Sequence, residues 1–117
     1  MDTNLVFNSQ LDEARGICTM KLTGPLVLSN MFDFQKRLRE EKSRGLIIDL
    51  SDVPYIDSAG IGVLVNGMVS CKNHGRTLVL EGVTERVMTV FRITKVDSLF
   101  HLADSKEEAE ALAASAS

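Results

Sequence analysis

Ser58 is the residue whose surroundings most suggest chemistry. It lies in the segment "YIDSAGIG", residues 55–62, where it follows the carboxylate Asp57 and precedes a run of small residues. A serine at the start of a helix can serve as a nucleophile, as the cap of that helix or as an acceptor for phosphate. The rest of the chain has to distinguish between these roles.

A catalytic role for Ser58 finds little support in the sequence. The nucleophile elbow of hydrolases reads G-x-S-x-G, and Ile56 stands where the first glycine would be. A triad needs a histidine, and His74 lies about 24 Å from Ser58 if the segment between them is helical. The second histidine, His101, falls in a predicted short core strand. We therefore expect no catalytic residue and no enzymatic activity.

The glycines around Ser58 do not form a nucleotide-binding pattern. A dinucleotide fingerprint beginning at Gly60 would need a small residue at the position of Val65, and no lysine follows the glycines as in a Walker A motif. Cys18 and Cys71 lie far apart with no histidine at ligand spacing, so we expect two buried thiols. The sequence thus predicts no cofactor and no metal site.

Composition restricts the class of protein. The chain has 117 residues, which suits one domain, with 44% hydrophobic and 25% charged residues. Its net charge of −3 and its scattered basic residues argue against nucleic acid as a partner. No stretch approaches the ~20 apolar residues of a membrane span, and residues 1–10 do not resemble a signal peptide. We expect a single domain over residues 1–117, located in the cytoplasm.

Hydrophobic periodicity predicts an α/β fold. Two strands open the chain: a short one at residues 5–7, which ends in a polar turn over residues 8–13, and a longer one at residues 16–24. Strands and helices then alternate, which favours helices packed on a sheet. Further strands are expected at residues 45–50, 77–83 and 98–103.

The expected helices follow recognisable start and stop signals. Ser29 or Asn30 can cap a first helix that Gly45 ends. A second helix is expected from Gly60 to about residue 74, a third after Thr84, and a fourth at the capping box that begins with Ser105. We expect a central mixed sheet of four to five strands with about four helices, and a flexible tail from about residue 113.

The small residues after Ser58 suggest a contact surface. Asp57 and Ser58 are both preferred N-cap residues, and one cap is sufficient. Glycines cost about 0.5–1 kcal/mol each inside a helix, so those near Ser58 indicate close approach of another backbone, either a partner's or the domain's own sheet. Farther along, the uncharged helix face suits an interface or a solvated surface. The predicted partner-binding residues are Asp57, Ser58, Ala59, Gly60, Gly62 and Asn66.

A phosphate on Ser58 would act as a switch at this surface. It adds roughly −1.5 to −2 charges at the positive end of a helix, where the folded domain tolerates it. A partner packed over the helix start would meet a bulky anion beside Asp57 and be repelled. Phosphorylation would then control binding without refolding the domain.

The stretch "LIIDLSDVPYIDSAGIGVL", residues 46–64, resembles the STAS domain of bacterial anti-sigma factor antagonists. The hallmark of that domain is a strand ending in D-L-S, followed by a loop into D-S-A/S-G-L/I-G. The segments "GICTMKLTGPL" and "HGRTLVLEGVTERVMTVFRITKVDSLFHLADSKEEA" extend the resemblance over nearly the whole chain. It departs from the family at Lys95-Val96-Asp97, where many members have a glycine in a stretch that reads I-T-G-L-x-x-L-F.

The resemblance implies a STAS-like fold and a regulatory function. In the family, the serine after the aspartate is phosphorylated by a partner that is both an anti-sigma factor and a serine kinase. The unphosphorylated antagonist binds this partner and frees a sigma factor, which regulates transcription; phosphorylation ends the complex and a PP2C-type phosphatase restores it. By motif position the acceptor is Ser58, and Asp49 and Ser51 fall in the strand-end motif near the binding surface. The alternative is a STAS module without phosphorylation, serving as a scaffold or small-ligand sensor in a signalling or transport complex.

Overall fold

Strands and helices alternate through most of the protein. The computed structural model describes residues 4–114, and this part of the chain forms five strands, four α-helices and one 3-10 helix. In chain order the elements are β1 (Val6–Asp12), β2 (Ile17–Thr23), α1 (Phe32–Glu40), β3 (Gly45–Asp52), α2 (Ser58–Asn73), β4 (Thr77–Glu81), α3 (Glu85–Ile93), η1 (Asp97–Leu99), β5 (His101–Ala103) and α4 (Lys106–Ala114).

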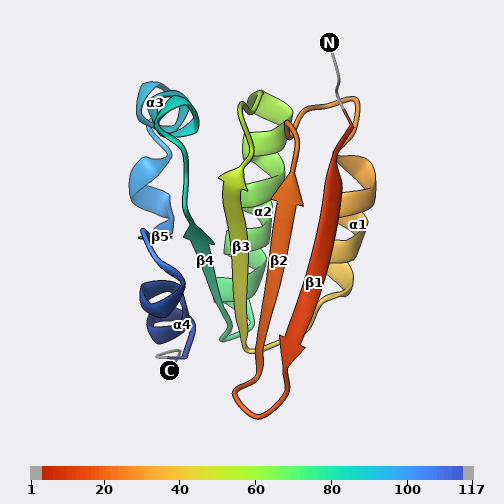
Figure 1. Ribbon diagram of the computed structural model, residues 1–117, viewed down its shortest axis with the longest axis vertical. Helices are drawn as coiled ribbons and strands as arrows, with labels where there is room; N and C mark the ends of the chain where they lie inside the picture. Colours follow the sequence, from red (N-terminus) through yellow and green to blue (C-terminus); the bar gives the residue numbers. More distant parts are fainter. Residues whose placement is uncertain (1–3, 115–117) are drawn as a thin grey trace.

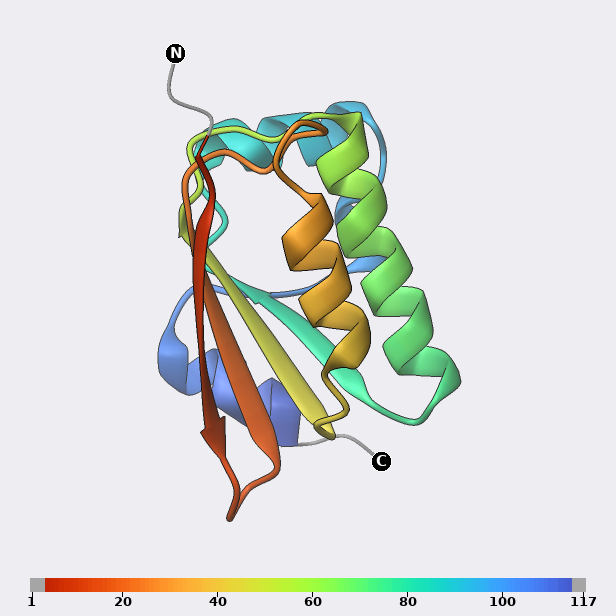
Figure 2. The ribbon, with the colours of Figure 1, turned by 90° about the vertical axis from the view of Figure 1, so that its right-hand side faces the viewer.

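The sheet is mixed and has the order β1-β2-β3-β4-β5. β1 pairs with β2 in an antiparallel hairpin, and the pairs β2–β3, β3–β4 and β4–β5 are parallel. Parallel neighbours need a crossover, and here helices supply it. α1 and α2 therefore cover one face of the sheet and α4 covers part of the other (Figure 2). The carboxyl ends of β2, β3 and β4 meet at one edge, the upper edge in Figure 1, where α2 begins. These findings confirm the predicted fold class.

The core has two unequal parts on the two faces of the sheet. β3 contributes to both: Leu46 and Ile48 pack under α1 and α2, whereas Ile47 packs under α4. This explains why residues 45–50 form a continuous apolar run instead of an alternating pattern. The smaller part consists of Ile17, Ile47, Val79, Ala103, Ala109 and Ala113.

The first strand is longer than predicted. β1 continues to Asp12, through the segment that was expected to be a polar turn, and all seven of its residues pair with β2. β1 is an edge strand, and most of its side chains are exposed. Its polar residues therefore carry no apolar alternation by which the strand could be recognised.

The predicted start of the first helix is wrong. Neither Ser29 nor Asn30 caps α1; the helix begins at Phe32, and Met31 occupies the N-cap without a side-chain hydrogen bond. Asn30 closes the preceding turn instead, because its Oδ1 accepts a hydrogen bond from the Val27 amide (3.1 Å). Side chains of this type often bond nearby backbone groups, so a turn competes with a cap.

The predicted end of this helix is also wrong. α1 ends at Glu40, and Gly45 is the first residue of β3. A Cβ on Gly45 would lie 2.9 Å from the carbonyl oxygen of Ala113. Glycine is required there because α4 packs against the strand, and not because a helix ends.

Other boundaries agree with the sequence. Thr84 caps α3 by accepting a hydrogen bond from the Val87 amide (3.3 Å), and Gly75 follows α2 with a φ of 69°. Ser105 Oγ accepts from the Glu108 amide at the start of α4 (3.1 Å). α2 begins two residues before the predicted Gly60.

The C-terminal helix reaches into the predicted tail. Ala113 and Ala114 still belong to α4, and Ala113 is buried. The rest of the tail predicted from about residue 113 lies outside the described residues. Within residues 4–114, no helix is long and apolar enough to cross a membrane.

Candidate functional site

The start of α2 is joined by backbone hydrogen bonds to the loop between β2 and α1. The Leu26 amide donates to the Tyr55 carbonyl oxygen (3.2 Å), and the Asp57 amide donates to the Leu26 carbonyl oxygen (3.3 Å). Leu26 and Ile56 thereby form an isolated parallel bridge. These bonds join the loop that follows β2 to the loop that precedes α2, and they hold the first turn of α2 in place at the upper edge of the sheet.

Asp57 is the cap of α2. Its Oδ1 accepts a hydrogen bond from the Gly60 amide (2.9 Å), which is the N3 position of the helix. Its Oδ2 accepts from the Leu28 amide in the neighbouring loop (3.0 Å). Both carboxylate oxygens are therefore engaged within the domain.

Ser58 is the first residue of α2, and its side chain is exposed. Because Asp57 caps the helix, Ser58 is not needed for capping. Its hydroxyl makes no hydrogen bond to any residue between positions 4 and 114. The fold thus presents an unengaged hydroxyl at the positive end of a 16-residue helix.

The two glycines of the first turn have different environments. Gly60 is buried, and a Cβ there would lie 2.3 Å from the Leu26 carbonyl oxygen and 2.6 Å from Ile56 Cγ1. A Cβ on Gly62 would meet nothing within 4 Å among the described residues. Gly60 is therefore needed for close packing within the domain, against the loop that contains Leu26. Gly62 leaves open space beside the helix, where the backbone of a partner could approach.

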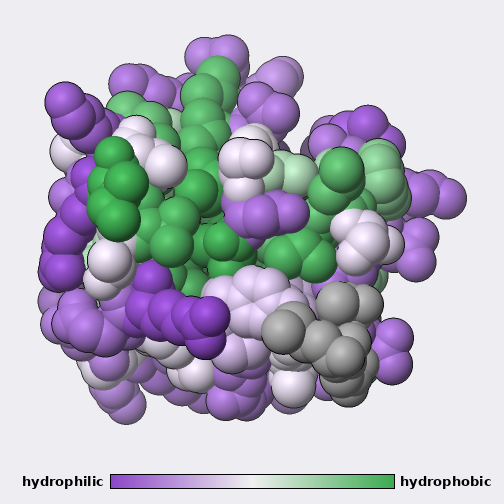
Figure 3. All heavy atoms as spheres, turned by 90° about the horizontal axis from the view of Figure 1, so that it is seen from above, coloured by the Kyte–Doolittle hydropathy of each residue, from purple (hydrophilic) through white to green (hydrophobic). Residues whose placement is uncertain are grey.

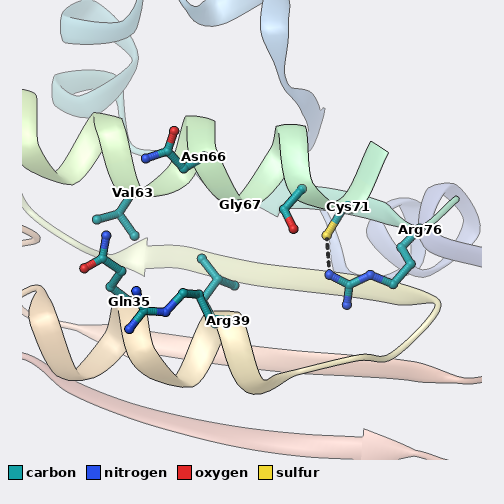
Figure 4. A pocket seen from close by; sticks show the side chains of 9 residues that line it. Gln35, Arg39, Val63, Asn66, Gly67, Cys71 and Arg76 are labelled. Carbon is teal, nitrogen blue, oxygen red and sulfur yellow. Dashed lines mark hydrogen bonds between the residues drawn. The ribbon is translucent and has the colours of Figure 1, made fainter. Parts of the chain in front are cut away.

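The predicted partner-binding residues do not share one surface. Ala59 is half-buried and packs against the main core, and Gly60 is buried. Asn66 is exposed two helical turns beyond Ser58, where it lines a cleft between α1 and α2 (Figure 4). Ser58 and Gly62 remain as the accessible pair in the first turn, with the carboxylate of Asp57 beside them.

Asp49 and Ser51, the residues of the strand-end motif, lie on the same face of β3 as Ile47, which is the face that α4 partly covers. Asp49 Oδ1 accepts hydrogen bonds from the Ser51 amide (2.9 Å) and hydroxyl (2.7 Å). Lys21 Nζ lies 3.6 Å from Asp49 and 3.2 Å from Asp52. Burial, followed by the charge of Asp49, raises the pKa of Glu81 on the adjacent strand. Asp49 and Ser51 stabilise the end of β3 through this network.

Two exposed hydrophobic side chains lie just before α1 and at its first residue, and they were not predicted from the sequence as functional residues. Leu28, whose amide binds Asp57, is 56% exposed, and Phe32 at the start of α1 is 60% exposed. Seen from above, hydrophobic side chains gather over this end of the molecule within a polar rim (Figure 3). The signal for Phe32 was that it does not fall on the buried face of α1 defined by Phe34 and Leu38, whereas Leu28 lies before the helix and had no such signal.

The histidines do not support hydrolase chemistry at Ser58. His74 lies just beyond the far end of α2, where its Nδ1 is 2.8 Å from the Ser70 carbonyl oxygen. His101, which was predicted to lie in a core strand, is the exposed first residue of β5. Neither histidine is hydrogen-bonded to Ser58.

The chain is similar in sequence to a known domain family and to one of its relatives. The STAS domain family model matches residues 8–109. The anti-sigma-B factor antagonist of Staphylococcus aureus (strain NCTC 8325 / PS 47) is 29% identical over 70 residues, which are 60% of this chain and 65% of that protein. The match therefore spans less than two thirds of that relative's length.

Solved structures extend the likeness over most of the chain. A crystal structure of a Thermotoga maritima protein, assigned as an anti-sigma factor antagonist, has a TM-score of 0.84 at 25% identity and covers 92% of this chain and 93% of its own. The anti-sigma factor antagonist SpoIIAA in its unphosphorylated form has a TM-score of 0.73 at 17% identity, covering 89% and 92%, and shows the fold alone. By the family match and the shared fold, this chain belongs to the STAS domain family.

Proposed function

We propose that this protein is an anti-sigma factor antagonist whose binding is switched by phosphorylation of Ser58. In this proposal the unphosphorylated protein binds an anti-sigma factor with serine kinase activity and so frees a sigma factor. The kinase transfers phosphate to Ser58, which ends the complex, and a PP2C-type phosphatase restores the free hydroxyl. The protein acts as the substrate of these enzymes and regulates transcription through its partner.

The observation that carries the proposal is the division of roles between Asp57 and Ser58. Asp57 caps α2 with one oxygen and binds the Leu28 amide with the other, while the exposed Ser58 hydroxyl has no partner within residues 4–114. A kinase can modify this hydroxyl without breaking a hydrogen bond of the fold. Phosphate at the start of a helix is also compatible with the helix dipole, so the domain stays folded.

The surroundings of Ser58 explain how a phosphate there could prevent a partner from binding. Exposed hydrophobic residues near the helix start, Leu28 among them, suit contact with a partner protein. Phosphorylation adds a hydrated dianion beside the Asp57 carboxylate at this surface. Desolvating both anions against a partner would oppose binding strongly.

Two of the similar proteins support this proposal through their known roles. The S. aureus relative is an anti-sigma-B factor antagonist, and SpoIIAA, which shares the fold, has been solved in an unphosphorylated and a phosphorylated form. A second candidate function, a ligand-sensing STAS module, is favoured by the cleft between α1 and α2.

A capture experiment tests the proposal. Wild type, Ser58→Ala, Ser58→Asp and Asn73→Asp are used as baits in native lysate. Asn73 is an exposed residue at the far end of the same helix, about 22 Å from Ser58 and outside the lining of the cleft, and so controls for an added carboxylate. We expect every bait except Ser58→Asp to capture a serine kinase. Capture of the same proteins by all four baits would contradict the switch and favour the scaffold alternative.

A further inference from the structure

We propose that the cleft between α1 and α2 is a binding site for a small organic carboxylate with a hydrocarbon body. The cleft has a volume of about 310 Å³, within the range of small-molecule sites. The part of α2 that lines it runs from Val63 to Cys71, and Ser58 is not among the lining residues (Figure 4). The residues that line it are Gln35, Leu38, Arg39, Val63, Asn66, Gly67, Ser70, Cys71 and Arg76.

The charge of the cleft favours an anion. Two of its lining residues are arginines and, among the described residues that line it, none is acidic, although the whole chain carries a net charge of −3. The Arg39 guanidinium has no hydrogen bond or ion pair within residues 4–114. Its planar fork of donors is therefore available to hold a carboxylate through two parallel hydrogen bonds.

Arg76 adds a fixed positive charge at one end of the cleft. Its Nη1 donates to the Glu41 carbonyl oxygen (2.7 Å), and its Nη2 donates to Cys71 Sγ (3.3 Å). Burial raises the pKa of the Cys71 thiol, so this sulfur stays neutral at pH 7 and does not compensate the guanidinium. The positive charge of Arg76 is held in place by neutral acceptors.

The carboxylate of Glu41, whose backbone carbonyl oxygen binds Arg76, already has partners of its own. Glu41 Oε1 lies 2.8 Å from Arg37 Nη2, and its Oε2 accepts hydrogen bonds from Ser43. These partners outweigh the effect of burial and hold the pKa of Glu41 at about 2. Glu41 is thus ionised but paired with Arg37, and within residues 4–114 neither Arg39 nor Arg76 has an acidic partner.

The rest of the lining indicates what kind of anion fits. Leu38, Val63 and Cys71 are buried and form an apolar wall for a hydrocarbon group. Gln35, on the side of α1 toward α2, and Asn66 of α2 also line the cleft and add two polar amides (Figure 4). Free phosphate suits the cleft less well, because the cleft flanks the side of α2 and offers no helix N-terminus.

The proposal is tested by titrating the full-length protein and following its amide resonances by NMR. The probes are benzoate, its neutral analogue benzyl alcohol, inorganic phosphate, and N-acetylglutamate α-amide as a mimic of an acidic side chain on a partner protein. We expect benzoate to bind saturably and to shift the side-chain amides of Gln35 and Asn66. The other three probes should bind at least about tenfold more weakly.

Two charge-matched variants locate the anion. Arg39→Gln should weaken benzoate binding by about tenfold, whereas Lys36→Gln, an exposed cation of the same helix outside the cleft, should leave it within about twofold. Equal binding of benzoate and benzyl alcohol, equal weakening by both variants, or absence of saturable shifts would overturn the proposal. Preferential binding of phosphate or of the acetylglutamate amide would overturn it in favour of that occupant.

Discussion

The start of α2 and the cleft beside its other end are built in the same way but carry opposite charge. At the start, both carboxylate oxygens of Asp57 accept hydrogen bonds, whereas the neighbouring Ser58 hydroxyl has no partner in the part of the chain that the structure describes. Beside the cleft, Glu41 is paired with Arg37 and Ser43, whereas the Arg39 guanidinium likewise has no partner within residues 4–114. The first region combines a carboxylate with a neutral hydroxyl, whereas the second combines two cations with an apolar wall.

This comparison separates residues that stabilise the fold from residues that remain available for function. Polar groups that the fold uses lose their hydrogen bonds when they are replaced, so their variants lose stability. Unused polar groups can be replaced with little effect on stability, and their variants should change binding instead. Each pair of variants below tests this division.

The largest effect is expected from the two glycines of the first turn. Gly60→Ala places a Cβ 2.3 Å from the Leu26 carbonyl oxygen and should lower the free energy of unfolding by about 3 kcal/mol. Gly62→Ala meets open space and should raise it by about 0.5–1 kcal/mol, because alanine is the better helix former. Urea denaturation measures both variants. Similar losses for the two would contradict the assignment of only Gly60 to packing.

The engaged carboxylate of the cleft region should give stability a pH dependence. The pKa of Glu41 is about 2 in the folded protein, whereas its ordinary value, which we take for the unfolded chain, is 4.5. The ionised form of Glu41 therefore stabilises the fold above pH 4.5. This stabilisation, about 3 kcal/mol at most from the size of the shift, is lost as the pH falls from 4.5 to 2. Glu41→Gln should therefore be less stable than wild type at pH 7, by an amount that shrinks toward pH 2. Urea denaturation measures the difference, and Glu40→Gln, a change at the exposed neighbouring residue, is the control that should stay within about 0.5 kcal/mol of wild type at pH 7.

The next effect distinguishes the cap from the switch. Asp57→Ala removes the N-cap and the acceptor for the Leu28 amide, and it should lower the free energy of unfolding by about 1–2 kcal/mol. Ser58→Ala removes a hydroxyl that bonds to none of the described residues and should stay within about 0.5 kcal/mol of wild type. Equal losses in thermal denaturation would mean that both side chains cap α2.

The smallest effect is expected at Lys95, whose backbone is left-handed. Its φ of 61° costs a non-glycine residue about 1–2 kcal/mol. Lys95→Gly should stabilise the protein by about 0.5 kcal/mol, because the added backbone entropy of the unfolded chain offsets part of the gain. Lys95→Ala keeps the strain and serves as the control; a gain of the same size in both variants would exclude backbone strain as the cause.

The elements that sequence reasoning recovered are those with a local cause. Thr84, Ser105 and Gly75 were recognised because caps and left-handed turns depend on a few neighbouring residues. The extent of β1 was missed because an edge strand is specified by its partner, β2. Gly45 was misread because the reason for a glycine there, contact with Ala113, is 68 residues away in the chain.

The site was recovered in part for the same reason. The motif around Ser58 is contiguous, so the residues could be named, but propensity could not decide whether Asp57 or Ser58 caps the helix. That decision depends on geometry and on Leu28, which comes from another loop. The cleft had no signal in the sequence, since its residues come from α1, α2 and the turn before β4.

The most direct test of the central claim uses the kinase captured by the wild-type protein. The complex is incubated with ATP, the bound and released fractions are separated, and the phosphorylated residue is located by tandem mass spectrometry. We predict one phosphate, on Ser58, found in the released protein, while Ser58→Ala stays bound and unmodified. A phosphate on another residue, or Ser58-phosphorylated protein that remains in the complex, would contradict the account.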